Sequence, residues 1–372
     1  MKIPFLDLRT QYLELKAELD EAVLRTLDSG WYILGRRCEA FERAFKEYLV
    51  GGREGYVIGV NSGTDALKLS LLAAGVGVGD EVVTVANTAI PTATAICSTG
   101  AVPVFCDVNP DTWLMEPTLL ESRITEKTRA VIPVHLYGAA CDMTPILRLA
   151  ERHRLAVIED VAQATGSEYG GSKCGTMGDF GAFSFYPSKN LGACGDGGAI
   201  FVRSPESRDR IMKLRNYGQS TRYLAALPRG ENSRLDEIQA EILSVKLRHL
   251  ERWNAARREL SAYYRERLEQ AALSVRVQGE YPASDAARHL FVLKSEPSLR
   301  DRLMERMQAR GVQTLIHYPH PLYRQPAFAV SGGSNPVCEE LCASVLSLPF
   351  HPYLTRGEID YVVKSLAESL AG

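Results

Sequence analysis

The stretch Ser184–Ile200, "SFYPSKNLGACGDGGAI", places a single lysine, Lys189, between an aromatic, apolar run and a segment rich in glycine. An ammonium group in apolar surroundings is costly unless a nearby group compensates its charge. Lys189 is therefore either an ordinary surface lysine on a loop or an amine held in a pocket because a reaction uses it. The sequence on both sides of this stretch distinguishes the two interpretations.

Seven short runs rich in Val and Ile predict the strands of a central sheet. Near-continuous apolar runs are typical of strands buried on both faces, as in mostly parallel α/β sheets. Helical patterns separate the earlier runs: in residues 62–75, Leu67 and Leu71 repeat at helical spacing, Ser62 is the N-cap and Gly75 the end. The strands are expected at residues 55–60, 81–86, 102–108, 130–138, 155–160, 182–186 and 198–203.

From about Ser233 the pattern changes to a long helix, in which Leu235, Ile238, Ile242 and Val245 form one apolar stripe. We expect this helix to lead from the sheet domain into a smaller α+β domain. The predicted division is a large domain over residues 1–250, with an N-terminal helix, and a small C-terminal domain over residues 251–372.

Composition and charge exclude several classes of protein. The chain has 372 residues and a net charge of −2, so it lacks the excess of positive charge that is typical of proteins that bind nucleic acid. Its eight cysteines form no C-x-x-C pair, and the spacing of His317 and His320, with prolines after each, does not indicate a metal site. The N-terminus has no signal-peptide core, and prolines interrupt the apolar stretch near residue 95. We expect a soluble, cytoplasmic protein.

Ligands of open α/β sheets bind at the carboxyl ends of strands, and several polar residues are expected there. Asp160 ends one apolar run, where it is either a helix N-cap or a carboxylate that keeps a cationic ligand atom protonated. Gly63 follows another run and opens a helix, which forms either an ordinary capped helix or a phosphate site. Asn232 and Ser233 precede the long helix, where capping is the simpler interpretation.

Taken together, these features require one ligand with a phosphate, a ring nitrogen that pairs with a carboxylate, and an aldehyde that reacts with a lysine. Pyridoxal 5′-phosphate has all three. The glycine-rich segment after Lys189 is not a dinucleotide loop, because a strand pattern rather than a helix follows it.

The sequence resembles the DegT/DnrJ/EryC1/StrS family of pyridoxal-phosphate-dependent nucleotide-sugar aminotransferases over essentially its whole length. The motifs that carry the resemblance include "IPFLDL", "GVNSGTDAL", "VIPVHLYG", "VIEDVAQATG", "SFYPSKNLG", "NSRLDEIQAEIL" and "IHYPHPLY". The resemblance implies the type I aminotransferase fold, with a mostly parallel seven-stranded sheet. It also implies a homodimer with shared active sites.

The resemblance assigns cofactor contacts residue by residue. Lys189 matches the lysine that binds the cofactor aldehyde and acts in catalysis. Asp160 matches the partner of the ring nitrogen, and Gln163 the partner of the ring hydroxyl. The other implied contacts are Ala162 under the ring, Gly63, Thr64 and Ser184 around the phosphate, and Asn232 from the neighbouring subunit.

Substrate contacts are expected from His317 and Tyr318, in the segment associated with the sugar, and from the aromatic side chain of Tyr32. Arg37 and Arg222 are candidates for the nucleotide diphosphate. Two positions depart from the family: Ala89 stands where many members have an aromatic residue on the cofactor, and Tyr323 where many have histidine.

The implied reaction is transfer of an amino group from glutamate to a nucleotide-linked 6-deoxy keto-sugar, with the ketone at C3 or C4. Two alternatives stay open: transamination of a cyclitol or another small ketone, and a regulatory protein that keeps the fold without turnover. The intact set of Lys189, Asp160, Gln163 and Ser184 favours an enzyme, and Lys189 argues against the dehydratase branch, which has histidine there.

Overall fold

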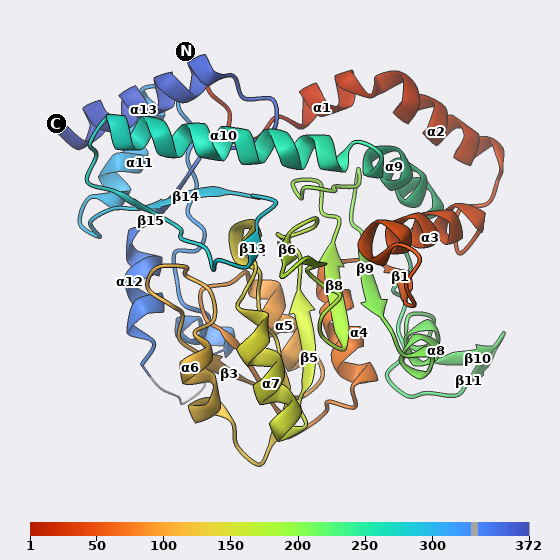
Figure 1. The fold of residues 1–372 in the computed structure, drawn as a ribbon. Coiled ribbons are helices and arrows are strands. Elements are labelled where there is room, and N and C mark those ends of the chain that lie inside the picture. The colour runs from red at the N-terminus through yellow and green to blue at the C-terminus, as the bar shows by residue number, and fades with distance from the viewer. Residues whose placement is uncertain (329–333, 372) are drawn as a thin grey trace.

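The computed structural model describes residues 1–328 and 334–371 and contains the predicted seven-stranded sheet (Figure 1). The strand order is β1-β9-β8-β5-β4-β2-β3. Only β9 runs antiparallel to its neighbours, so the sheet is mostly parallel, as predicted. The strands are β1 (Tyr56–Val60), β2 (Glu81–Val85), β3 (Val102–Cys106), β4 (Thr128–Val131), β5 (Ala156–Asp160), β8 (Phe180–Ser184) and β9 (Gly198–Val202).

Helices cover this sheet, and the strands are buried almost throughout. Ile58, Val83, Val131 and Ile158 are at most 1 % exposed, as continuous apolar runs predict. The helix α4 packs against β8 and β9, which brings the start of α4 close to the end of β8. The covering helices are α3 (Arg36–Val50), α4 (Gly63–Ala73), α5 (Ile90–Ser98), α7 (Met143–His153) and α8 (Pro205–Leu214).

One strand is shorter than predicted. The run over residues 130–138 forms β4 only as far as Val131, and Leu136–Gly138 is a turn of 3₁₀-helix, η2. Pro133 cannot donate to a strand ladder, and Tyr137 adopts a left-handed backbone with φ of 61°. The Tyr137 N–H donates instead to the Gln163 side chain, which directs this segment toward the carboxyl end of β5.

The predicted long helix is two helices, α9 (Glu237–Leu247) and α10 (Leu250–Gln270). Figure 1 shows α10 running across the top of the molecule, from α9 to a second group of elements. That group contains a three-stranded sheet in the order β12-β14-β15 and a separate core around Tyr264, Phe291 and Phe350. Its elements are β12 (Arg276–Val277), β14 (Phe291–Lys294), β15 (Val345–Leu348), α11 (Arg300–Ala309) and α13 (Arg356–Ala371).

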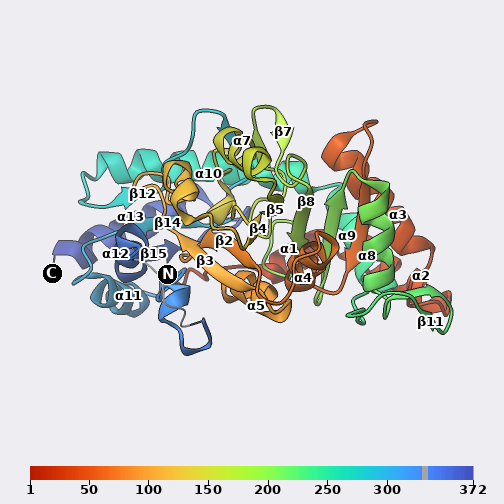
Figure 2. The ribbon, with the colours of Figure 1, turned by 90° about the horizontal axis from the view of Figure 1, so that it is seen from below.

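The N-terminal residues contact this second group. Ile3 pairs with Val312 in a parallel bridge and is buried in the same core. Figure 2 shows the two termini on the same side of the molecule, close to α11 and α13. The first residues therefore pack with the C-terminal part of the chain, and the division at residue 250 stays a prediction.

The remaining elements are short or peripheral. They are α1 (Leu8–Glu14), α2 (Lys16–Asp28), α6 (Pro117–Leu120), η1 (Glu121–Arg123), β6 (Glu168–Tyr169), β7 (Ser172–Lys173), β10 (Gln219–Thr221), β11 (Leu224–Ala225), β13 (Ser284–Asp285), η3 (Leu322–Arg324), η4 (Pro326–Phe328) and α12 (Pro336–Ser344). Within the described residues, no helix combines the length and the apolar character needed to cross a membrane.

Candidate active site

Lys189 is not an ordinary surface lysine. It follows β8 in a tight turn, in which its backbone N–H donates to the Tyr186 carbonyl at 2.8 Å. Its side chain borders a cavity of about 310 Å³. Burial lowers the pKa of the Lys189 amine to about 8, and the Asp160 carboxylate offsets this effect only in part. Near neutral pH, the neutral and nucleophilic form of this amine is therefore far more populated than that of an exposed lysine.

Asp160 is the last residue of β5, and its carboxylate is held in a fixed orientation. Oδ2 accepts a hydrogen bond from the Thr92 hydroxyl at 3.0 Å, and Oδ1 accepts one from the Ala162 N–H at 3.1 Å. Burial raises the pKa of Asp160. A buried carboxylate with so few donors gains from a cation beside it, which a protonated ring nitrogen provides. Thr92 is a site residue that sequence analysis missed.

The start of α4 and the end of β8 form a narrow cradle. A Cβ atom placed on Gly63 would lie 2.6 Å from the Cβ of Ser184, so only glycine fits there. Ser62 caps the helix by accepting from the Asp65 N–H at 3.1 Å. The N–H groups of Gly63 and Thr64, in the first turn, have no partner within the helix. This arrangement fits a phosphate group.

Gln163, which follows β5, connects its loop to the segment around residue 318. Its Oε1 accepts from the Tyr137 N–H at 2.8 Å, and its Nε2 donates to the Tyr318 hydroxyl at 2.9 Å. The Tyr137 hydroxyl donates to the carbonyl of His317. The side-chain amide of Gln163 therefore has one orientation, with its nitrogen toward Tyr318.

His317 is a neutral hydrogen-bonding group in this site. Its Nδ1 lies 2.8 Å from the Ser347 hydroxyl. Burial, and after it the charge of Lys189, lowers the pKa of His317 to about 4. The cavity beside Lys189 is lined by His317, Tyr318 and Gln163 as well, so the structure brings these four predicted residues together.

Other predicted residues do not line this cavity. Tyr32 is exposed and its hydroxyl lies 3.3 Å from the Leu27 carbonyl. Asn232 is exposed and pairs with Asn216 at the base of the β10–β11 hairpin. Whether they contact a ligand through a second subunit stays a prediction.

The two candidate arginines also lie outside the cavity. Arg37 donates to the carbonyl of Arg25 at 2.8 Å. The Arg222 guanidinium lies over the ring of Tyr223, 5.0 Å from its centroid, at the tip of the hairpin.

The two departures from the family pattern have different surroundings. The Tyr323 hydroxyl donates to Glu339 at 2.7 Å, and its ring lies beside Phe105 with centroids 5.7 Å apart. The hydroxyl group of Tyr323 therefore already has a hydrogen-bond partner within the chain. Ala89 is half-buried at the start of α5, three residues before Thr92.

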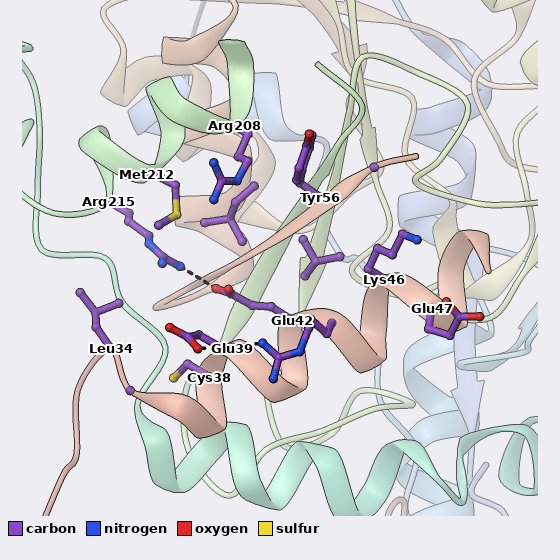
Figure 3. A pocket seen from close by; sticks show the side chains of 15 residues that line it. Leu34, Cys38, Glu39, Glu42, Lys46, Glu47, Tyr56, Arg208, Met212 and Arg215 are labelled. Atoms are coloured by element: carbon purple, nitrogen blue, oxygen red, sulfur yellow. Dashed lines mark hydrogen bonds and ion pairs between the residues drawn. The ribbon is translucent and has the colours of Figure 1, made fainter. Parts of the chain in front are cut away.

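A larger cavity, of about 660 Å³, lies between α3, β1 and α8 (Figure 3). Its lining contains neither Lys189 nor Asp160. An ion pair of 2.8 Å joins Arg215 to Glu42 there, and the same Glu42 oxygen accepts from the Gly59 N–H at 2.8 Å. These contacts fix β1 against α3, and because Lys189 lies elsewhere, we place the chemistry at the cavity that Lys189 borders.

The arrangement fits three of the polar groups of pyridoxal 5′-phosphate. The cradle at Gly63 suits the phosphate, the Asp160 carboxylate suits the ring nitrogen, and the Lys189 amine suits the aldehyde. A mostly parallel sheet carries these groups at the carboxyl ends of its strands. This fold and this site are those of the type I pyridoxal-phosphate-dependent aminotransferases.

The comparisons with known proteins identify the family. The chain belongs to the DegT/DnrJ/EryC1/StrS aminotransferase family, which matches residues 13–367. It is 46 % identical over 369 residues to the erythromycin biosynthesis sensory transduction protein EryC1 of Saccharopolyspora erythraea, covering 98 % of this chain and 99 % of that protein. It is 43 % identical to the dTDP-3-amino-3,4,6-trideoxy-alpha-D-glucose transaminase of Streptomyces venezuelae, covering 99 % and 96 %.

A solved structure agrees with these sequence relatives. The crystal structure of S. venezuelae DesV in complex with a ketimine intermediate superimposes with a TM-score of 0.94 at 43 % identity, covering 99 % of this chain and 98 % of that one. The family and the type I fold predicted from the sequence are thus confirmed.

Proposed function

We propose that the protein transfers the amino group of glutamate to a nucleotide-linked 6-deoxy keto-sugar, with the ketone at C3. The observation that carries this proposal is that Lys189 and Asp160 lie in one site, in a chain that is 43 % identical to a dTDP-3-amino-sugar transaminase. The name of that relative favours C3 over C4 and thymidine diphosphate over other nucleotides.

Pyridoxal 5′-phosphate, when bound, supplies an aldehyde that exchanges amines and a ring that accepts electrons. Lys189 would hold the aldehyde through Nζ, and its free amine would take the proton from the α-carbon of the donor. Asp160 holds the proton on the ring nitrogen through its buried carboxylate. Gln163 and the first turn of α4 orient the ring and the phosphate.

For the acceptor, His317 and Tyr318 provide hydrogen-bonding groups of fixed orientation. The neutral imidazole of His317 is anchored by Ser347 through Nδ1, which leaves its Nε2 for a sugar hydroxyl. The Tyr318 hydroxyl accepts from Gln163 and retains its own proton to donate. A sugar with several hydroxyl groups is complementary to such a surface.

The regulatory alternative gains support from the name of the Saccharopolyspora relative, a sensory transduction protein. The geometry favours catalysis, because a buried amine with a pKa of about 8 next to a fixed carboxylate is what amine exchange needs. Transamination of a cyclitol or another small ketone remains the alternative among reactions.

A stopped-flow comparison tests the substrate assignment. The protein, first converted to its aminated form with glutamate, is mixed with dTDP-linked 3-keto-6-deoxy and 4-keto-6-deoxy sugars, a keto-cyclitol and several 2-oxo acids. We expect the 3-keto sugar to restore the aldehyde absorbance fastest. Fast reaction with 2-oxo acids and none with keto-sugars would overturn the substrate and leave the cofactor assignment in place.

We also propose a cytoplasmic homodimer whose sites are shared, with Asn232 reaching the partner's phosphate. Its support is the exposed position of Asn232 at the base of a hairpin that projects from the body in Figure 1. Mixing Lys189→Ala and Asn232→Ala proteins should regenerate one intact site per exchanged heterodimer. No recovery of activity after verified exchange would contradict sharing.

A further inference from the structure

Arg257, on α10, carries a buried guanidinium that no carboxylate of the described chain pairs with. The residue is 4 % exposed. Its Nη1 donates to the carbonyl oxygens of His289 and Phe350, at 3.2 and 3.3 Å, and its Nε is buried without a partner. Nη2 makes no hydrogen bond within the described residues either. A buried guanidinium normally pairs with an anion, so Arg257 has unused capacity to bind one.

The cavity that Arg257 borders is the one that contains Lys189. Its polar lining includes two histidines, His289 and His317, and the described residues that line it include no aspartate or glutamate. Burial lowers the pKa of His289 well below its usual value, and the positive charges of Lys189 and Arg257 lower it further. This end of the site is therefore positive and suits a negatively charged group.

We propose that Arg257 binds a carboxylate of the amino donor and determines the specificity of the donor half of the reaction. The proposal rests on the proposed function, because it presupposes that an amino acid enters this cavity. Arginine is suited to the task because its planar fork matches the geometry of a carboxylate. The two backbone carbonyls that bind Nη1 fix the guanidinium before the donor arrives.

The diphosphate of the acceptor is the other anion that enters the site. In an amino acid such as glutamate, the α-carboxylate is bonded to the carbon that carries the reacting amine, whereas the diphosphate is attached to C1 of the sugar, two ring carbons from a C3 ketone. Arg257 and Lys189 border one cavity of about 310 Å³, which is small for a ligand site. A group close to the reacting carbon therefore suits Arg257 better than a distant diphosphate does.

Measuring the two half-reactions separately tests this assignment. Wild-type, Arg257→Gln and Arg257→Lys holoenzymes are mixed with glutamate in one series and with a dTDP-3-amino-6-deoxy sugar in the other, and the cofactor absorbance is followed. For Arg257→Gln, we expect the glutamate concentration at half-maximal rate to rise about 100-fold, as for loss of a hydrogen bond to a charged group. The value for the amino sugar should change less than about threefold. Arg257→Lys should show a smaller loss, confined to the donor series.

Arg258→Gln is the matched control. Arg258 is the next residue of the same helix, does not line the cavity, and lies 3.9 Å from each of Glu251 and Asp285. It should leave both half-reactions unchanged. Glutarate binding to each holoenzyme by calorimetry adds a readout without turnover, and it should weaken only in the Arg257 variants.

The outcomes separate the two proposals. If wild-type enzyme reacts with no amino acid, the proposed function fails and the assignment of Arg257 fails with it. If wild-type enzyme reacts and the Arg257 variants keep normal glutamate dependence, only the Arg257 assignment fails. Equal losses in both series would mean a structural role, and a loss in the amino-sugar series alone would assign Arg257 to the diphosphate; either overturns the proposal.

Discussion

Gln163 and Tyr318 are 155 residues apart in the chain and are joined by a hydrogen bond of 2.9 Å from the Gln163 amide nitrogen to the Tyr318 hydroxyl. This contact connects the carboxyl end of β5 to the segment that carries His317. Because the Gln163 amide oxygen accepts from the Tyr137 N–H, the two contacts together fix the orientation of the amide. Gln163 thus joins the loop after β5 directly to the segment of His317 and Tyr318.

Removal of the Tyr318 hydroxyl should disturb this link without disrupting the fold. Tyr318→Phe leaves the Gln163 nitrogen without its partner, so we expect a loss of about 1 kcal/mol in unfolding free energy. Urea denaturation measures it, and Gln163→Ala with the double variant completes a thermodynamic cycle. Strictly additive losses would contradict a direct interaction between the two side chains.

The attachment of cofactor to cofactor-free protein should depend on pH through Lys189. Only the neutral amine adds to an aldehyde, and the lowered pKa of Lys189, about 8, means that the amine is mostly protonated below that pH and mostly neutral above it. The rate of covalent attachment, followed by absorbance, should therefore rise with pH through a midpoint of about 8. A midpoint above pH 10, near the ordinary pKa of lysine, would contradict the buried environment of the amine.

Gly63→Ala should selectively impair cofactor binding. The added Cβ would lie 2.6 Å from the Ser184 Cβ, which pushes β8 away from α4 and distorts the phosphate cradle. We expect the dissociation constant for pyridoxal 5′-phosphate to rise at least about tenfold, by analogy with other losses of a charge-assisted contact. Fluorescence titration measures it.

Gly357→Ala is a suitable control for Gly63→Ala. Gly357 lies in the first turn of α13, and an added Cβ there meets nothing within 4 Å. The control should bind cofactor normally and gain a little stability, since alanine is the better helix former. If Gly63→Ala bound cofactor as tightly as this control, the cradle would not be the phosphate site.

Sequence patterns predicted the features that neighbouring residues determine, namely the strands and the ends of a helix. All seven strands of the central sheet were expected, because each is an apolar run buried on both faces. The N-cap of α4 at Ser62 and its end at Gly75 were also expected, and the structure confirms them with the Ser62 cap and the left-handed Gly75 after the C-cap Ala74. The positions of Lys189 and Asp160 beside strand ends could be predicted because each adjoins an apolar run within one contiguous motif, whereas their roles stay predictions.

Contacts between distant parts of the chain could not be predicted. Glu237 accepts hydrogen bonds from the N–H groups at the start of α3, including that of Cys38 about 200 residues earlier. The expectation that Asn232 or Ser233 caps the long helix was wrong, because α9 begins at Glu237 and the Ser233 hydroxyl donates to Asp65 instead. No local pattern indicates which remote partner a polar side chain will find.

The same limit explains why Thr92 and Arg257 were missed. Thr92 is one of many threonines in its region, and only the packing of α5 against the sheet places it 3.0 Å from Asp160. Arg257 lies in a helix rich in arginine, where nothing in the sequence distinguishes it from the exposed Arg252 or the half-buried Arg258. Only its burial next to the cavity does so.

Peptide mapping after reduction tests the central claim, that Lys189 carries the cofactor, most directly. Holoenzyme is treated with borohydride, which makes the link between lysine and cofactor permanent, and is then digested and analysed by mass spectrometry. We expect a single pyridoxyl-phosphate label on Lys189, and no label in Lys189→Ala protein treated identically. A label on Lys173, Lys246 or any other lysine would contradict it.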